Sequence, residues 1–248
     1  MNTLPTVSDT KRAFYSRHTR PVNSVYRRVV EELLVEMHLL RVNADFRYDA
    51  IYALGIVTSF NRFMEGYEPA ADVDSIFEAL VRAEALEPET IKSNAKHLLE
   101  TVRPQSLSQL MDWFTSAATS GGGEFESQIK AIADSPSFKY SRLFGIGLYT
   151  LLETVAPEAI KSEETLKENL TTLGTILPLS LDKLTKDIEF YRANLEKVQQ
   201  ARQTLADIVE ADRKRNAQRL AEQQSPREVE ASSAPSETGE ESSSAPSN

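Results

Sequence analysis

The sequence contains no cysteine, and this absence excludes several kinds of chemistry. Disulfide bridges, zinc–thiolate sites, iron–sulfur clusters and thiol nucleophiles all require cysteine. Glycine is also scarce, with 9 residues in 248, and three of them are adjacent at positions 121–123. Because long stretches contain neither glycine nor proline, the composition favours helices over a β-fold with many turns.

Long hydrophobic runs are absent as well. The most apolar stretches are residues 50–60 and 143–155, and both are shorter than the roughly 18–20 residues needed to cross a bilayer. The N-terminus lacks an apolar run of signal-peptide length. We therefore interpret the two apolar stretches as buried helices of a globular domain.

Positive charge is in the minority, because 28 Lys and Arg residues stand against 37 Asp and Glu residues, which gives a formal net charge of −9. Binding to nucleic acid relies on a positive surface that neutralises phosphates, so the sequence argues against that function. The charge is unevenly spread: residues 1–30 carry a net +5, whereas residues 222–248 carry a net −5. One end of the chain could therefore meet an acidic surface that repels the other end.

Apolar residues repeat at the helical period along most of the chain. Val25, Val29, Leu33, Met37 and Leu40 form one such stripe after a capping residue at position 23 or 24. Similar patterns predict helices over 8–17, 46–67, the segment around 76–81, 89–102, 107–114, 125–133, 138–155 and 162–177. The predicted fold is all-α, with residues 1–179 forming a multi-helix globular bundle.

From position 180 the apolar pattern changes to a heptad seam, with apolar residues spaced alternately by three and four. The seam runs through Leu181, Leu184, Ile188, Tyr191, Leu195, Val198, Arg202, Leu205 and Val209. A helix over 180–222 would be roughly 60 Å long at about 1.5 Å per residue. We expect its C-terminal half to project from the bundle or to pair with a partner. Residues 223–248 are rich in Ser, Pro and Glu, which predicts a disordered tail.

No catalytic or metal-binding constellation is visible in the sequence. His18, His38 and His97 fall in or beside different predicted helices without metal-ligand spacing, and no GxSxG motif occurs. His38 lies beside an apolar stripe, which favours a structural role. We therefore predict no catalytic residue, no metal and no cofactor, and keep a helical enzyme with an unrecognised site as a minor alternative.

The long helix carries the features that best suit a partner surface. The candidate partner-binding residues are Tyr191, Leu195, Val198, Arg202, Leu205, Arg213 and Arg215. The basic residues near its end either compensate the negative helix terminus or dock to an acidic partner. Arg202 either extends out of a seam that ends there or fixes register against a partner carboxylate.

Four segments together resemble the thylakoid formation family of cyanobacteria and plastids. They are PTVSDTKRAF (5–14), RPVNSVYRRVVEELLVEMHLL (20–40), FRYDAIYALGIVTSFNRFMEGYEP (46–69) and FKYSRLFGIGLYTLLE (138–153). Plastid members carry transit peptides, whereas this sequence starts at the shared domain, which is typical of a cyanobacterial member. The resemblance implies an all-helical protein with a long C-terminal helix and no catalytic residues.

The resemblance also implies a function. Members of the family are non-catalytic accessory proteins in thylakoid formation and in photosystem II biogenesis and repair. The implied partners are an FtsH-type membrane protease complex and photosystem II assembly or repair intermediates. The implied location is peripheral, on the cytoplasmic side of the thylakoid membrane with a soluble pool, and we expect a monomer. The alternative is a helical module whose aromatic-rich central helices bind a pigment such as chlorophyll, or a lipid acyl chain.

Overall fold

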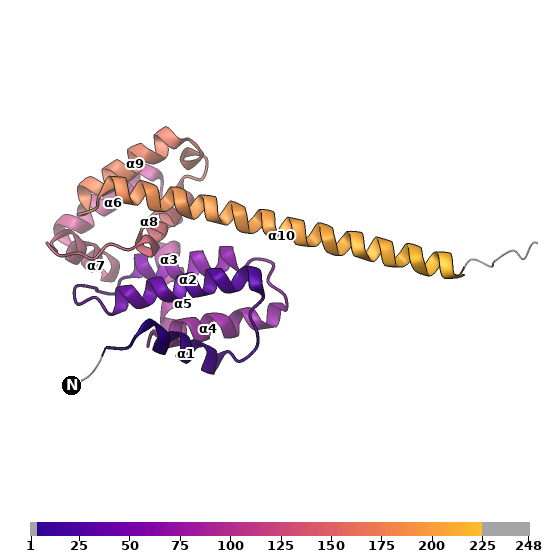
Figure 1. Ribbon diagram of the computed structural model, residues 1–248. Coiled ribbons are helices and arrows are strands. Elements are labelled where there is room, and N and C mark those ends of the chain that lie inside the picture. Colours follow the sequence, from indigo (N-terminus) through magenta and orange to yellow (C-terminus); the bar gives the residue numbers. More distant parts are fainter. Residues whose placement is uncertain (1–3, 225–248) are drawn as a thin grey trace, which may run out of the picture. The chain divides into compact units, whose positions relative to one another are not determined.

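The computed structural model describes residues 4–224, and every regular element in that range is helical (Figure 1). The α-helices are α1 (Val7–Arg17), α2 (Ser24–Arg41), α3 (Ala50–Phe63), α4 (Val73–Ala83), α5 (Pro88–Val102), α6 (Leu107–Ser120), α7 (Glu124–Ala133), α8 (Arg142–Val155), α9 (Glu163–Ile176) and α10 (Leu181–Gln224). Two 3₁₀ turns, η1 (Ala70–Asp72) and η2 (Ala159–Lys161), complete the described elements. The predicted all-α class with a long C-terminal helix is therefore confirmed.

Capping side chains define where several helices begin. Asn23 caps α2 as predicted, its side chain accepting a hydrogen bond from the Val25 amide. α1 begins at Val7 and not at the predicted position 8, because Thr6 caps it. Thr6 accepts from the Asp9 amide at 3.2 Å, while the Asp9 carboxylate accepts from the Thr6 amide at 3.0 Å. This reciprocal pair satisfies two amides that the helix leaves unpaired.

The two central helices, α3 and α8, are shorter than predicted. The apolar pattern suggested helices over 46–67 and 138–155, but α3 begins after Asp49 and α8 begins after Ser141. Each of these residues accepts a hydrogen bond from an amide in its helix, at 2.7 Å from Tyr52 and 3.1 Å from Phe144. Apolar periodicity continues past a cap because flanking loop residues also pack on the core.

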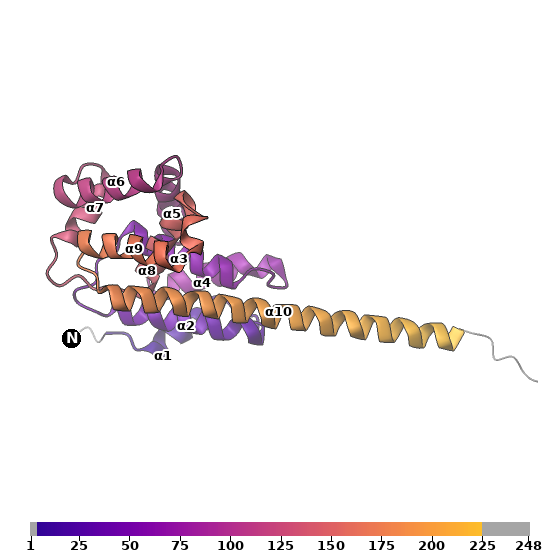
Figure 2. The ribbon, with the colours of Figure 1, turned by 90° about the horizontal axis from the view of Figure 1, so that it is seen from above.

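α3 lies at the centre of the bundle and packs against both α8 and α5 (Figure 2). Glycine allows α3 and α8 to approach closely. A Cβ added at Gly55 would overlap the carbonyl oxygen of Leu143, and one at Gly147 would overlap the carbonyl oxygen of Ile51. The helices therefore cross antiparallel with their backbones in contact. Gly147 on α8 and Gly55 on α3 are thus counterparts at this crossing.

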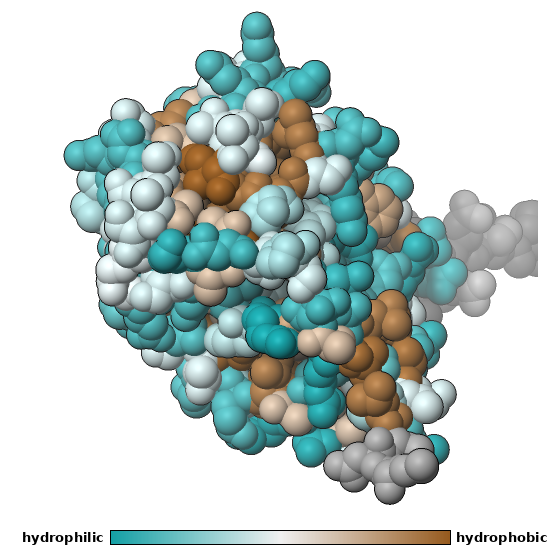
Figure 3. Space-filling view, turned by 90° about the vertical axis from the view of Figure 1, so that its left-hand side faces the viewer, coloured by the Kyte–Doolittle hydropathy of each residue, from teal (hydrophilic) through white to brown (hydrophobic). Residues whose placement is uncertain are grey.

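The remaining helices cover this central pair. α1 packs on α2 and α4, α6 packs on α7 and α9, and each turns one apolar face inward. α3 and α8 instead bury side chains on nearly all sides. On the face drawn in Figure 3, the hydrophobic residues that the structure describes lie in several patches separated by hydrophilic ones. Most of the large apolar side chains are buried in the core, as expected for helices with one apolar face turned inward.

The chain divides by its internal contacts into two compact units, the first ending at Gln203 and the second beginning at Thr204. The first 23 residues of α10 belong to the first unit, where Leu184, Ile188 and Tyr191 are buried in the core. Side chains from position 203 to 220 are exposed. The domain boundary at 179/180, the projecting half and the coiled-coil pairing stay predictions.

The predicted disordered tail, 223–248, lies mostly outside the described residues. Positions 223 and 224 still belong to α10, and residues 225–248 are not described. Among the helices of residues 4–224, none combines the length and apolarity that a bilayer crossing requires.

Candidate functional site

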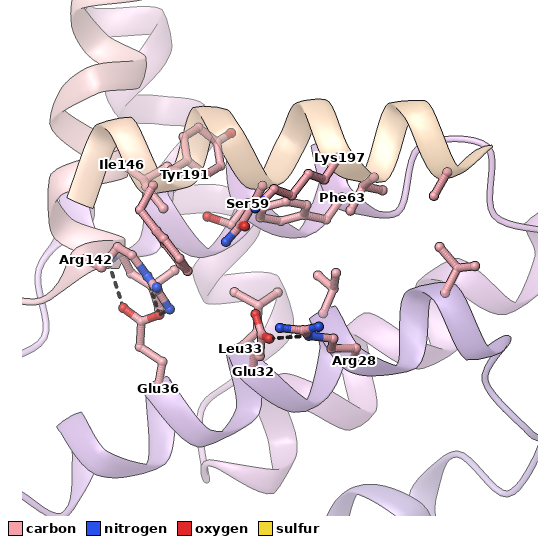
Figure 4. Close-up of a pocket in the computed structure, with 17 residues that line it drawn as sticks. Arg28, Glu32, Leu33, Glu36, Ser59, Phe63, Arg142, Ile146, Tyr191 and Lys197 are labelled. Atoms are coloured by element: carbon pink, nitrogen blue, oxygen red, sulfur yellow. Dashed lines mark hydrogen bonds and ion pairs between the residues drawn. The ribbon is translucent and has the colours of Figure 1, made fainter. Parts of the chain in front are cut away.

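A pocket opens between α2 and the part of α10 that belongs to the first unit. We call it the α2–α10 pocket (Figure 4). Its volume is about 280 Å³. α3 and the start of α8 form its other walls. The lining residues are Val25, Arg28, Val29, Glu32, Leu33, Glu36, Ser59, Phe63, Arg142, Leu143, Ile146, Phe190, Tyr191, Asn194, Lys197, Val198 and Ala201.

An ion pair between Glu36 of α2 and Arg142 of α8 forms one end of the pocket. The closest guanidinium nitrogen lies 2.5 Å from the carboxylate, and the Leu143 amide donates to the other carboxylate oxygen at 3.3 Å. Burial raises the pKa of Glu36, and the Arg142 charge opposes that shift. The pair joins α2 to the N-terminus of α8, where a negative charge is favoured.

A wider hollow, of about 980 Å³, lies along the outer side of α2 and shares the Glu36–Arg142 pair with the α2–α10 pocket. Its lining includes the cations Arg27, Lys139 and Lys183. The Lys183 ammonium lies over the Tyr140 ring at 5.0 Å from its centroid. The two hollows adjoin at the Glu36–Arg142 pair, so α2 lines both of them.

Tyr191, the first predicted partner-binding residue, is a core residue with 2% exposure. Its ring meets the Phe63 ring edge-on, with centroids 5.7 Å apart. Burial raises the pKa of its hydroxyl to about 12, and the neighbouring Arg62 charge opposes that rise. Arg62 in turn pairs with Glu153 of α8. Tyr191 therefore fastens α10 to α3 and α8.

Leu195, Val198 and Arg202 continue the seam and are partly buried against the first unit. Arg202 forms an ion pair with Glu65 at 3.6 Å, and its guanidinium leaves no room for a Cβ at Gly66. A polar residue thus occupies a seam position because the loop after α3 supplies a carboxylate and a glycine there. Sequence spacing alone could not identify that partner, which lies 137 positions earlier in the chain.

Leu205, Arg213 and Arg215 belong to the second unit and are exposed. Ile208 and Val209 are exposed beside Leu205 on the same helix. Arg215 pairs with Asp212 at 3.7 Å and Lys214 with Glu210 at 2.7 Å, whereas Arg213 forms no ion pair with any described residue. The basic cluster is therefore only partly neutralised along its own helix.

The histidines occupy separate places in the bundle. His38 is buried, and its Nδ1 lies 2.9 Å from the Thr10 hydroxyl. The Nδ1 of His18 lies 3.0 Å from the Ser75 hydroxyl, and His97 packs edge-on against Phe125. Among the described residues, no group of three or more His, Asp or Glu side chains could hold a metal ion.

Two buried carboxylates, Asp49 and Glu84, were not predicted from the sequence. Asp49 caps α3, and burial raises its pKa to about 7. Glu84 follows α4, and burial raises its pKa to about 7, with Arg41 at 3.6 Å opposing the shift. An Asp directly before an apolar helix is a capping signal that could have revealed the first. Both groups connect helix ends to the core.

Comparison with known proteins places this architecture. A family model described as thylakoid formation protein matches residues 6–220. The chain belongs to the thylakoid formation protein family. A relative in this family, protein Thf1 of Cyanothece sp., is 54% identical over 235 residues, covering 95% of this chain and 100% of the relative. Protein Thf1 of Acaryochloris marina is 57% identical over 215 residues, covering 87% of each chain.

The fold of this chain is similar to that of a solved structure. The structure of Psb29 at 1.55 Å matches with a TM-score of 0.74 at 46% identity, covering 86% of this chain and 99% of that chain. This likeness and the family match together confirm the resemblance that the four sequence segments indicated.

Proposed function

We propose that this protein is a non-catalytic accessory factor for photosystem II biogenesis and repair. It binds and stabilises an FtsH-type membrane protease at the cytoplasmic side of the thylakoid. Membership of the thylakoid formation protein family supports the setting. The binding role is supported by the exposed part of α10.

The observation that carries the binding role is an uncovered apolar stripe. Leu205, Ile208 and Val209 are 43%, 52% and 50% exposed. Their spacing of three and one places them on one face of the helix. An amphipathic helix with one apolar face is a common ligand for a hydrophobic groove in a partner protein. We call these three residues the α10 stripe.

Positive charge follows the α10 stripe by one turn. Arg213, Lys214 and Arg215 are exposed there, and Arg213 has no ion pair within the described residues. A partner with an apolar groove and acidic groups at one end would match both features. Leu205, Arg213 and Arg215 thus remain partner-binding candidates, while Tyr191, Leu195, Val198 and Arg202 hold the preceding turns against the bundle.

Affinity purification from solubilised thylakoid membranes tests the proposal. Tagged full-length protein is compared with a variant that carries Leu205→Glu and Val209→Glu, which keep helix propensity while charging the α10 stripe. We expect the wild-type chain to retain an FtsH-type protease and the variant to lose most of it. Wild-type protein that retains no protease, or equal retention by both chains, would contradict the proposal.

A matched control adds the same two charges away from the stripe. Gln200→Glu and Gln203→Glu change exposed residues of the preceding turns. At about 100° per residue they lie about 140° and 160° around the helix from Leu205, on the face opposite the stripe. We expect this control to retain the protease. Loss of binding in the control as well would mean that added negative charge, and not the apolar stripe, determines the result.

A further inference from the structure

The α2–α10 pocket has walls of two kinds. Its apolar walls come from α2, α3, α8 and α10 and include Val29, Leu33, Phe63, Ile146 and Val198. Polar side chains occur at separate positions among them. Such a combination of apolar walls with a few placed polar groups is typical of small-molecule sites.

The charges in the pocket are balanced except at one position. Glu36 pairs with Arg142 at 2.5 Å, and Arg28 pairs with Glu32 at 2.9 Å. Lys197 of α10 also lines the pocket and forms no ion pair with any described residue. Figure 4 shows the two pairs joined by dashed lines and Lys197 apart from both. The unmatched charge of the pocket is therefore positive.

A buried hydroxyl supplies a second, independent indication of a ligand. Ser59 of α3 is 0% exposed and lines the pocket, and its Oγ has no hydrogen-bond partner among the described residues. A buried hydroxyl without a partner costs free energy. A helical Ser can often bond to a carbonyl one turn earlier, and Ser59 does not do so. An acceptor atom on a bound molecule would satisfy it.

The size of the pocket restricts what it can hold. Its volume of about 280 Å³ lies just below the range of about 300–1,000 Å³ that is usual for small-molecule sites. A single flexible hydrocarbon chain suits such a space better than the broad macrocycle of a pigment. Apolar walls, one free cation and one free hydroxyl together favour a slender amphiphile with an anionic head.

We propose that the α2–α10 pocket binds a fatty acid. The hydrocarbon chain lies against Val29, Leu33 and Phe63, while the carboxylate meets the Lys197 ammonium and accepts a hydrogen bond from Ser59. A carboxylate held by an ammonium is a charge-assisted contact, which is stronger than a neutral one. The site lies wholly within the first unit and does not depend on the α10 stripe.

Calorimetric titration of the purified full-length chain with dodecanoate tests the assignment, with dodecanol as the neutral counterpart. We expect saturable binding of dodecanoate. Lys197→Met should weaken it about tenfold or more while leaving dodecanol binding unchanged. Lys186→Met is the matched control, because Lys186 lies on α10 outside the pocket and pairs with Asp182. We expect it to bind dodecanoate as the wild type does.

Two further variants separate pocket binding from loss of folding. Ser59→Ala should weaken dodecanoate binding severalfold without lowering the melting temperature, because the hydroxyl that it removes is unsatisfied. Ala201→Phe fills the pocket and should abolish binding, whereas Ala193→Phe, at an exposed position of the same helix, should not. Absence of saturable binding by the wild type, or binding unchanged by Ala201→Phe, would overturn the proposal.

Discussion

Replacing Gly55 by alanine tests the close crossing of α3 and α8. The new Cβ would overlap the carbonyl oxygen of Leu143, which is backbone and cannot rotate away. The two helices must therefore separate, and their separation loosens the packing of a core in which both are buried on nearly all sides. Overpacking of a core costs about 1–3 kcal/mol and occasionally more. Because this clash is with backbone, we expect a cost near the upper end of that range, about 3 kcal/mol.

The higher helix propensity of alanine offsets part of this loss of stability. Alanine is a better helix former than glycine by about 1 kcal/mol, so the net loss of unfolding free energy is about 2 kcal/mol. For a domain of 150–250 residues, about 1 kcal/mol changes the melting temperature by roughly 2–4 °C. Gly55→Ala should therefore melt roughly 4–8 °C lower than the wild type. Gly147→Ala should behave alike, because its Cβ meets the Ile51 carbonyl.

Gly174→Ala is the matched control. Gly174 also lies inside a helix, α9, but its added Cβ would meet only the Leu179 carbonyl oxygen at 3.7 Å, an ordinary contact. The same substitution should here raise the melting temperature by about 2–4 °C, since only the gain in helix propensity remains.

Thermal unfolding followed by far-ultraviolet circular dichroism measures all three variants, and urea unfolding gives the free energies. The double variant Gly55→Ala with Gly147→Ala adds a test of mechanism. Once the first alanine has separated the helices, the second should cost less than it does alone. Gly55→Ala as stable as the wild type, or Gly174→Ala as destabilised as Gly55→Ala, would refute the close-packing argument.

Three further predictions concern charged residues. Asp49 has a pKa raised to about 7 by burial, against about 3.9 when unfolded; its contribution to stability is thus full below about pH 4 and is lost as the pH rises to about 7. Asp49→Asn keeps the cap acceptor and should make urea unfolding less dependent on pH over that interval, by up to about 4 kcal/mol; an unchanged pH dependence would contradict the raised pKa. Arg202→Met keeps the aliphatic packing but loses the ion pair with Glu65, so the free energy of unfolding should fall by less than about 1 kcal/mol. A fall of several kcal/mol would contradict this small contribution of the ion pair. Arg213→Gln with Arg215→Gln should reduce protease retention at low salt and flatten its salt dependence, and retention as salt-sensitive as that of the wild type would exclude docking through this cluster.

Helix positions were largely predictable because they depend on local pattern. The stripe of α2 and its cap at Asn23 required only neighbouring residues, and both agree with the structure. The errors occurred at helix ends. Asp49 and Ser141 cap the starts of α3 and α8, whereas the apolar pattern placed both starts several residues earlier. A cap is a hydrogen bond made by one side chain, so a periodicity of apolar residues does not register it.

The candidate site was less predictable. Tyr191 and Leu205 occupy equivalent positions in the heptad pattern, which therefore predicts the same environment for both. In the structure Tyr191 is buried and Leu205 is 43% exposed. The difference comes from Phe63, which lies 128 positions before Tyr191 and contacts its ring. Arg202 likewise depends on Glu65 and Gly66. Residues distant in sequence decide these environments, and one sequence does not show which of them meet.

The amino-acid sequence by itself determined the all-helical class, the order of the helices, the long C-terminal helix and the family. These follow from apolar period, capping residues and extended sequence similarity, which are all local or cumulative along the chain. Only the tertiary structure decided which part of the seam is buried, and that Ser59 and Lys197 line one pocket. Burial depends on which surfaces pack together, and that is a property of the folded chain as a whole.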